Sequence, residues 1–367
     1  MAKERIGVKE LFALIILFEL GTALVIPIGF AAGQNVWVSV LLALIGGILL
    51  FLLYNYFAIR YPGLSFSLYT QKILGKYIGW AMSLLYIPLF IYIAARDLRE
   101  AGGLLLASTY DRTPLFAINA LMMIAVIYTV RKGIEVLARM AEIYLIIMII
   151  LGVLGNIFVL LSGIIEPKNL LPLFPHGLKP ILTTAYPNIL IFPFGEMVCF
   201  TTILPYLNKK SQAATIGLSA IIIGGMVLTI NSIILLCVLG PETVLRSSFP
   251  ALTAVSYINI ASFIQRLDTF ILILMVILGF VKITIYFFCA VIGTADLFRM
   301  KPSVTNIYLI GGVIFFSSLM IAPSYQAHIN EGLKIVPYLL HLPFHIAIPI
   351  LLLITAYIKQ KIKPTLL

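Results

Sequence analysis

Charged side chains inside long apolar stretches are the first residues in this sequence that could do chemistry. Glu196 lies in NILIFPFGEMVCFTT (residues 188–202), next to Pro193 and Gly195, and Glu19 and Lys282 lie in two other apolar stretches. A charge at the centre of a lipid bilayer costs ~3 kcal/mol on insertion scales, so each normally has a partner or a function. These stretches therefore raise the question of what their charges pair with or bind.

Lys282 is an isolated cation in GFVKITIYFF (residues 279–288). One interpretation is a lysine that extends toward the membrane surface or pairs with an acidic residue. The other is a functional charge, either standing in place of a bound sodium ion or responding to protons. Thr284 and Tyr286 would add hydroxyl groups beside it. The sequence leaves these interpretations open.

Two further groups of charges are predicted to be structural braces. In RDLREAGG (residues 96–103), Arg96 and Glu100 are four residues apart, so they would meet on one helix face. In GIEVLARMAEIY (residues 133–144), Glu135, Arg139 and Glu142 share a face in the same way. Arg139 is also the predicted partner of Glu196, with Glu19 as a further structural charge.

Signals for metal binding and for catalysis are weak. His341 and His345 have a spacing that can hold a metal, but Pro343 separates them and no acidic or cysteine ligand is near in sequence. The three cysteines all lie in apolar runs without paired spacing. We find no nucleophile–base motif, and we expect no metal, no cofactor and no enzymatic activity.

Composition identifies the surroundings of these charges. Of 367 residues, 62% are apolar and only 11% are charged, whereas a soluble domain keeps about a quarter charged. The net charge of +11 comes without a glycine-rich phosphate loop or basic–aromatic alternation, which argues against nucleic acid. With a cytoplasmic N-terminus, fifteen of the 25 lysines and arginines fall in inner connections, six in outer ones and four in the membrane. The positive-inside rule then predicts that both termini are cytoplasmic.

Apolar runs of about 20 residues, the length of a membrane crossing, predict ten transmembrane helices in a single domain covering residues 1–367. The predicted crossings are Leu11–Ala31, Val36–Ala58, Ile78–Leu106, Leu115–Val130, Ile134–Leu161, Ile181–Leu207, Ala214–Leu239, Thr269–Thr294, Ile307–Ile321 and Ile335–Ile358. Between them, residues 166–180 carry four prolines and predict an irregular loop, and residues 249–268 predict an amphipathic outer cap. Five helices per half would make the halves run in opposite directions, as inverted repeats of about 8–162 and 179–360.

The first helix of each half is predicted to be broken at mid-membrane. Gly21 and Thr22 follow Glu19 in helix 1, and Pro193 and Gly195 precede Glu196 in helix 6. Proline removes a hydrogen-bond donor and glycine permits non-helical angles. A single such position would be an ordinary kink, but matched positions in both halves predict unwound segments whose free backbone groups face a ligand.

Several segments together resemble a known family. These are ILGKYIGW (residues 73–80), RDLREAGG, GIEVLARMAEI and FPFGEMVCF (residues 192–200). The chain resembles, over essentially its whole length, the B subunit of GerA-type spore germinant receptors. That family is similar to the amino acid–polyamine–organocation superfamily, whose fold is the five-plus-five inverted repeat of the leucine transporter.

The resemblance implies a nutrient-sensing subunit in the spore inner membrane, with A and C subunits as partners. Its ligand would be a small nutrient, expected to be an amino acid, held at the unwound centres of helices 1 and 6. The residues implied are Gly21, Thr22, Phe194, Gly195, Glu196, Lys282 and Thr284. A free amino-acid carboxylate would meet Glu19 and Glu196, so either a basic residue neutralises one or the ligand is not a simple zwitterion.

Two alternatives to the sensor remain open. The first is a proton-coupled amino acid transporter with the same midplane site, which uptake into proteoliposomes would distinguish. The second is a subunit whose broken helices are structural and which lines an ion-release pathway.

Overall fold

The computed structural model describes residues 5–110, 112–258 and 267–362, and every regular element in these ranges is helical. The predicted all-helical fold is therefore confirmed. In the described part of the chain, eight helical segments are long and apolar enough to cross a membrane. The pair of α12 (Val304–Met320) and α13 (Tyr325–Lys334), bent by 106°, makes a ninth when it is taken as one broken span. The eight are Phe30–Arg60, Lys76–Ser108, Leu115–Lys132, Ile134–Leu161, Lys179–Tyr206, Lys210–Arg246, Asp268–Leu297 and Pro337–Lys361.

The α-helices of the first half are α1 (Val8–Leu20), α2 (Val36–Arg60), α3 (Phe66–Leu74), α4 (Lys76–Ser108), α5 (Leu115–Lys132) and α6 (Ile134–Leu161). Those of the second half are α7 (Lys179–Thr183), α8 (Phe200–Ile203), α9 (Ala213–Arg246), α10 (Pro250–Ser256), α11 (Asp268–Leu297), α12, α13 and α14 (Ile348–Ile362). Short 3-10 and π segments complete them: η1 (Gly21–Leu24), η2 (Phe30–Asn35), η3 (Pro167–Leu170), η4 (Thr184–Ile189), η5 (Phe194–Cys199), η6 (Leu204–Tyr206), η7 (Lys210–Gln212) and η8 (Pro337–Ala347).

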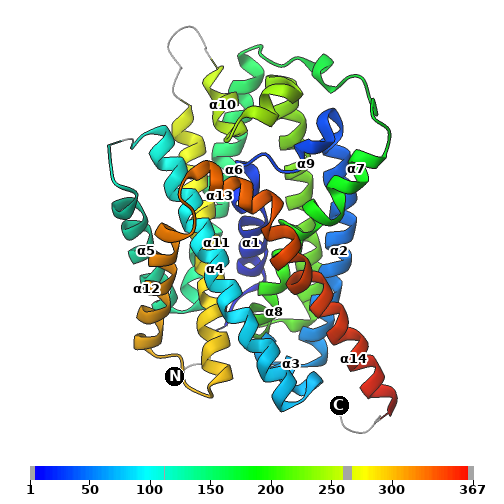
Figure 1. Ribbon diagram of the computed structural model, residues 1–367, viewed down its shortest axis with the longest axis vertical. Coiled ribbons are helices and arrows are strands. Elements are labelled where there is room, and N and C mark those ends of the chain that lie inside the picture. Colours follow the sequence, from blue (N-terminus) through cyan, green and yellow to red (C-terminus); the bar gives the residue numbers. More distant parts are fainter. Residues whose placement is uncertain (1–4, 111, 259–266, 363–367) are drawn as a thin grey trace.

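Helix length alone does not identify the first predicted crossing as a membrane span. Its α-helix, α1, has only 13 residues, because the helical path ends at Gly21 and continues as the short segment η1. Almost all of α1 from Leu11 to Leu20 is buried, and it lies in the interior of the bundle (Figure 1). Packing therefore supports a helix that is too short to be stable alone.

The first and sixth crossings run in opposite directions. The Ile6 amide donates to the Tyr206 carbonyl and the Asn208 amide donates to the Ile6 carbonyl, both at 3.0 Å. Thus α1 begins at the end of the bundle where Lys179–Tyr206 finishes. The chain enters α1 from the lower end of Figure 1 and leaves through α14 at that same end.

The two predicted connections are partly visible. Residues 166–178 form an irregular loop around η3, as expected. The predicted cap at 249–268 includes α10, which packs against α9 and α11, while its residues 259–266 lie outside the described ranges. The helix α6 presents a row of exposed apolar side chains, including Ile146, Ile150 and Val153, as expected of a helix that faces lipid.

Candidate functional site

The first break lies at η1, where Gly21 has φ +31° and ψ −133°. An L side chain rarely adopts this conformation, and a β-carbon on Gly21 would lie 2.9 Å from Cδ of Lys282. Glycine thus has two functions here: it turns the backbone out of the helix and leaves room for the lysine. Beyond the turn, the Thr22 carbonyl accepts hydrogen bonds from the amides of Val25 and Ile26.

The second break covers residues 192–199, where the chain makes a turn at Phe192–Pro193 and continues as η5 before α8 begins. The Tyr54 hydroxyl of α2 lies 3.1 Å from the Gly195 carbonyl and 2.6 Å from the His345 carbonyl of η8. This hydroxyl therefore supports backbone groups that an unbroken helix would have paired. Both predicted interruptions are confirmed.

A buried ion pair joins the second break to α11. Lys282 Nζ lies 2.7 Å from a carboxylate oxygen of Glu196 and 4.0 Å from one of Asp97 in α4, and all three side chains are at most 6% exposed. Nζ also lies 4.3 Å from the centre of the Phe192 ring, which adds a cation–π contact. One lysine thus neutralises charge from two helices.

A small cavity of 60 Å³ lies beside this ion pair. Its polar wall is formed by Thr22, Arg96, Asp97, Glu100, Glu196 and His341 of η8, and apolar residues such as Ile93, Phe192 and Leu333 of α13 complete it. Among the described residues, the Thr22 hydroxyl, one oxygen of Asp97 and one of Glu100 are buried without a hydrogen-bond partner. Buried polar atoms are normally satisfied, so these three are candidates to bind a ligand.

The helix α13 covers the cavity with Ile329, Gly332 and Leu333. Arg96 anchors this cover, because its guanidinium donates to the His328 carbonyl at 2.7 Å and lies 3.7 Å from the Glu331 carboxylate. The Tyr92 hydroxyl donates a hydrogen bond to the Glu331 carboxylate, at 2.7 Å. We call these interactions among Tyr92, Arg96, His328 and Glu331 the cover contacts.

Two predicted pairings are wrong. Arg96 does not pair with Glu100, because its side chain reaches α13 while Glu100 lines the cavity. Arg139 does not pair with Glu196: it is 69% exposed and pairs with Glu135 at 2.5 Å, four residues before it on α6. The partner of Glu196 is Lys282, which the sequence could not identify because the two are 86 residues apart.

The remaining predicted residues are distributed as follows. Thr22 and Glu196 line the cavity, and Gly21, Gly195 and Lys282 lie immediately around it. Phe194 packs against Gly47 instead, and the Thr284 hydroxyl donates to the Phe280 carbonyl of its own helix. Glu142 is half-buried on α6, away from the cavity.

Glu19 lies apart from the cavity, although the sequence places it near the first break. Its carboxylate packs against Gly224 of α9, where a β-carbon would lie 2.8 Å from an oxygen. It is fully buried, and neither oxygen has a hydrogen-bond partner in the described part of the chain. A ligand in the cavity therefore meets Glu196 but not Glu19.

Sequence reasoning missed several contributors. Asp97 was visible in RDLREAGG but had no predicted role, and Tyr54, His328 and Glu331 had no sequence signal. A helical projection of residues 93–100 would have helped, because Ile93, Arg96, Asp97 and Glu100 share the face that lines the cavity. The contacts from α13 depend on how α13 packs against α4 in the folded bundle, so a helical projection could not have found them.

The arrangement of broken helices around a buried site is that of the five-plus-five inverted-repeat transporters of leucine-transporter type. The chain is similar to MhsT, solved in complex with L-phenylalanine, with a TM-score of 0.68 and 14% identity over 97% of this chain and 99% of that chain. It is equally similar to Mhp1, a nucleobase-cation-symport-1 family transporter solved closed with bromovinylhydantoin bound, with a TM-score of 0.68 and 14% identity over 90% and 75% of the two chains. These likenesses establish the fold.

Sequence comparison then identifies the family. Residues 5–326 match the family model described as "Spore germination protein", and the chain belongs to this family. It is 40% identical to Spore germination protein KB of Bacillus subtilis (strain 168), over 98% of this chain and 97% of the relative. It is 26% identical to Spore germination protein YndE of the same organism, over 89% and 88% of the two chains. The chain is therefore a germination permease-like, multi-pass membrane protein.

Proposed function

We propose that this chain is the nutrient-sensing subunit of a spore germination receptor and that it binds an amino acid in the cavity between the two breaks. The observation that carries the proposal is the cavity wall itself. Thr22, Asp97 and Glu100 present buried polar atoms without partners, next to an ion pair that already neutralises Glu196. Relatives named as germination proteins supply the biological setting.

The charges of the wall favour a ligand with an amino group. Asp97 and Glu100 would accept hydrogen bonds from an ammonium group, and charge-assisted bonds of this kind are the stronger ones. The guanidinium of Arg96 lies on the same wall and would receive the carboxylate of a zwitterion. Because Lys282 pairs with Glu196, the repulsion expected from the sequence between Glu196 and a ligand carboxylate is reduced, and the charges of the wall suit a zwitterion.

Ligand entry requires movement of α13. The cavity of 60 Å³ is far below the ~300–1,000 Å³ of typical small-molecule pockets. The cover contacts hold α13 over it, so the proposal has two conformations, with α13 in place or displaced. A ligand acts as a signal only if it binds one of them better than the other. Partner subunits of the A and C type would read this change.

An experiment on the purified chain in nanodiscs tests the proposal. Amino acids, sugars and nucleosides are screened for thermal stabilisation, since a ligand that binds only the folded state raises its stability. We expect stabilisation by an amino acid and its loss in Glu100→Gln, with Glu242→Gln on the exposed end of α9 as control. Stabilisation that survives Glu100→Gln would place the ligand elsewhere.

The transporter fold favours one second candidate, a proton-coupled amino acid transporter using the same site. Labelled amino acid in proteoliposomes separates the two. Binding without accumulation supports the sensor, whereas accumulation driven by a pH gradient supports the transporter.

We place both termini in the cytoplasm and the protein in the spore inner membrane. A cysteine-accessibility assay on inner-membrane vesicles tests that orientation.

A further inference from the structure

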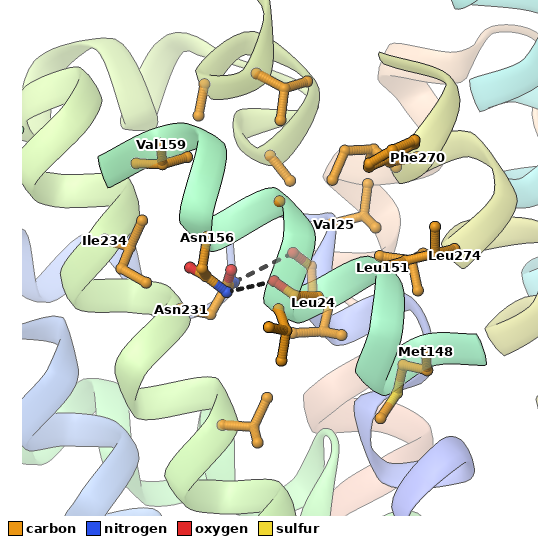
Figure 2. Close-up of a pocket in the computed structure, with 18 of the residues that line it drawn as sticks. Leu24, Val25, Met148, Leu151, Asn156, Val159, Asn231, Ile234, Phe270 and Leu274 are labelled. Atoms are coloured by element: carbon orange, nitrogen blue, oxygen red, sulfur yellow. Dashed lines mark hydrogen bonds between the residues drawn. The ribbon is translucent and has the colours of Figure 1, made fainter. Parts of the chain in front are cut away.

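A second cavity, of 390 Å³, lies on the opposite side of the first break (Figure 2). Its walls come from α6, α9, α10, α11 and the end of α1. Labelled side chains such as Met148, Leu151, Phe270 and Leu274 surround it, and nearly all of its lining is apolar. This volume is more than six times that of the cavity beside the Lys282–Glu196 ion pair, which we call the charged cavity.

Among the described residues of the wall, two asparagines carry the polar side chains. Asn231 of α9 donates to the Leu24 carbonyl at 3.3 Å, and Asn156 of α6 donates to the Gly152 carbonyl at 2.8 Å. Figure 2 shows both amides on the same side of the cavity. The Leu24 carbonyl belongs to η1, so one of these contacts supports the unwound backbone itself.

The first break is the wall that separates the two cavities. Leu20, Leu24 and Val25 face the apolar cavity, whereas Thr22 and Ile26 face the charged one. A change in the occupancy of one cavity therefore acts on the same stretch, residues 20–26, that lines the other. Contacts of this kind can couple two sites.

We propose that the apolar cavity holds the acyl chain of a membrane phospholipid, and that this chain supports the conformation of the first break. Water is a poor occupant, because it needs two to four polar partners and the lining offers few. A partner's transmembrane helix is also a poor occupant, since one turn ~10 Å wide and ~5 Å long needs about 400 Å³, as much as the whole cavity of 390 Å³, and a crossing has about five turns. An acyl chain is thin and fully apolar, and it fits without either difficulty.

The position of the cavity provides the route of entry. The helix α6 carries exposed apolar residues along its outer face, such as Ile149, Val153 and Ile157, and two of these positions, Ile149 and Val153, also line the cavity. The lipid-facing surface of α6 is thus continuous with the cavity lining. An acyl chain from the surrounding bilayer can enter laterally without crossing a polar surface.

Two glycines of α6 allow the cavity to be filled by substitution. A β-carbon on Gly152 or Gly155 would meet no atom within 4 Å, and both residues line the cavity. Either position therefore accepts a β-carbon without a clash, which makes both suitable for placing a larger side chain at the cavity, and either change also raises helix propensity. Gly312 of α12 is the matched control, because its β-carbon also meets nothing within 4 Å and it does not line this cavity.

Photolabelling tests occupancy directly. The purified chain is placed in phosphatidylglycerol–phosphatidylethanolamine nanodiscs that contain a phospholipid with a diazirine in its acyl chain, and labelled peptides are mapped. In the wild type we expect labelling concentrated on residues 148–159 and 20–25. In Gly155→Phe the labelling of these residues should fall to the background level found on α12, and in Gly312→Phe it should be retained. Labelling spread evenly over all lipid-facing helices, or unchanged in Gly155→Phe, would overturn the proposal. If Gly155→Phe does not fold, Gly152→Leu takes its place.

Hydrogen exchange of residues 20–26 tests the support of the break. Phospholipid added to lipid-stripped protein in amphipol should slow exchange in the wild type and in Gly312→Phe. In Gly155→Phe exchange should be slow before lipid is added, because the phenyl ring replaces the acyl chain. Exchange that does not respond to lipid in the wild type would contradict the proposed support. Neither measurement uses a nutrient, so failure here is distinguishable from failure of the proposed sensor.

Discussion

Replacing Lys282 with methionine should be among the most damaging substitutions in the membrane interior. It keeps an unbranched side chain only one heavy atom shorter and removes the charge that faces Glu196 at 2.7 Å and Asp97 at 4.0 Å. Both carboxylates would remain buried without their cation. Removing one partner of a buried pair costs about 3–5 kcal/mol, and we expect a loss of this size in the free energy of unfolding.

A double-mutant cycle isolates the pair from the general effect of each change. Glu196→Gln alone should also be destabilising, while Lys282→Met combined with Glu196→Gln should recover at least about 1.5 kcal/mol relative to the sum, the low end for close charge pairs. The free energy of unfolding can be followed by circular dichroism during SDS titration in mixed micelles. Arg139→Met is the control, because the exposed pair with Glu135 should contribute only about 0.2–1 kcal/mol.

The reasoning would be refuted by one result in particular. If Lys282→Met lost no more stability than Arg139→Met, and its effect simply added to that of Glu196→Gln, then the buried ion pair does not join the second break to α11. Burial and geometry would in that case be poor guides to which charges matter in this bundle.

Three further outcomes are expected. Gly21→Ala should lower the thermal midpoint of unfolding more than Gly33→Ala does. Both glycines have positive φ, but only at Gly21 would the added methyl group meet Lys282. Equal decreases in the midpoint would mean that backbone strain accounts for the whole effect. Tyr92→Phe removes a hydrogen bond to Glu331 worth about 1 kcal/mol; amide exchange in Tyr325–Lys334 should accelerate, and unchanged exchange would show that this bond does not hold the cover. Gly195→Leu should insert normally but lose thermal stabilisation by amino acids, because its β-carbon would lie 3.1 Å from His345 Cβ; retained stabilisation would move the site away from the second break.

Much of the fold was predictable because its signals are local. Apolar runs of sufficient length identify crossings without knowledge of their neighbours. Pro193 and Gly195 identify the second break in the same way, since they disrupt a helix through their own covalent structure. The first crossing was found from hydrophobicity although α1 alone has only 13 residues.

The pairing of charges was not predictable, because it depends on which helices become neighbours. Sequence spacing suggested Arg96 with Glu100, yet the bundle brings α13 within reach of Arg96 and leaves Glu100 at the cavity. Lys282 illustrates the same limit: the sequence left open whether it pairs with an acidic residue, and nothing in it singled out Glu196 as the partner. The apolar cavity had no signal at all, since its lining residues are ordinary for a membrane helix.

The most direct test of the central claim is a comparison of amino acid binding by the wild type and by Asp97→Asn in nanodiscs. The equilibrium dissociation constant of the stabilising amino acid is measured by calorimetry, with Glu242→Gln as the control. The proposed site predicts that Asp97→Asn loses binding while the control keeps it. Unchanged affinity in Asp97→Asn, in a variant that remains folded, would contradict the assignment of the ligand to the cavity between the breaks.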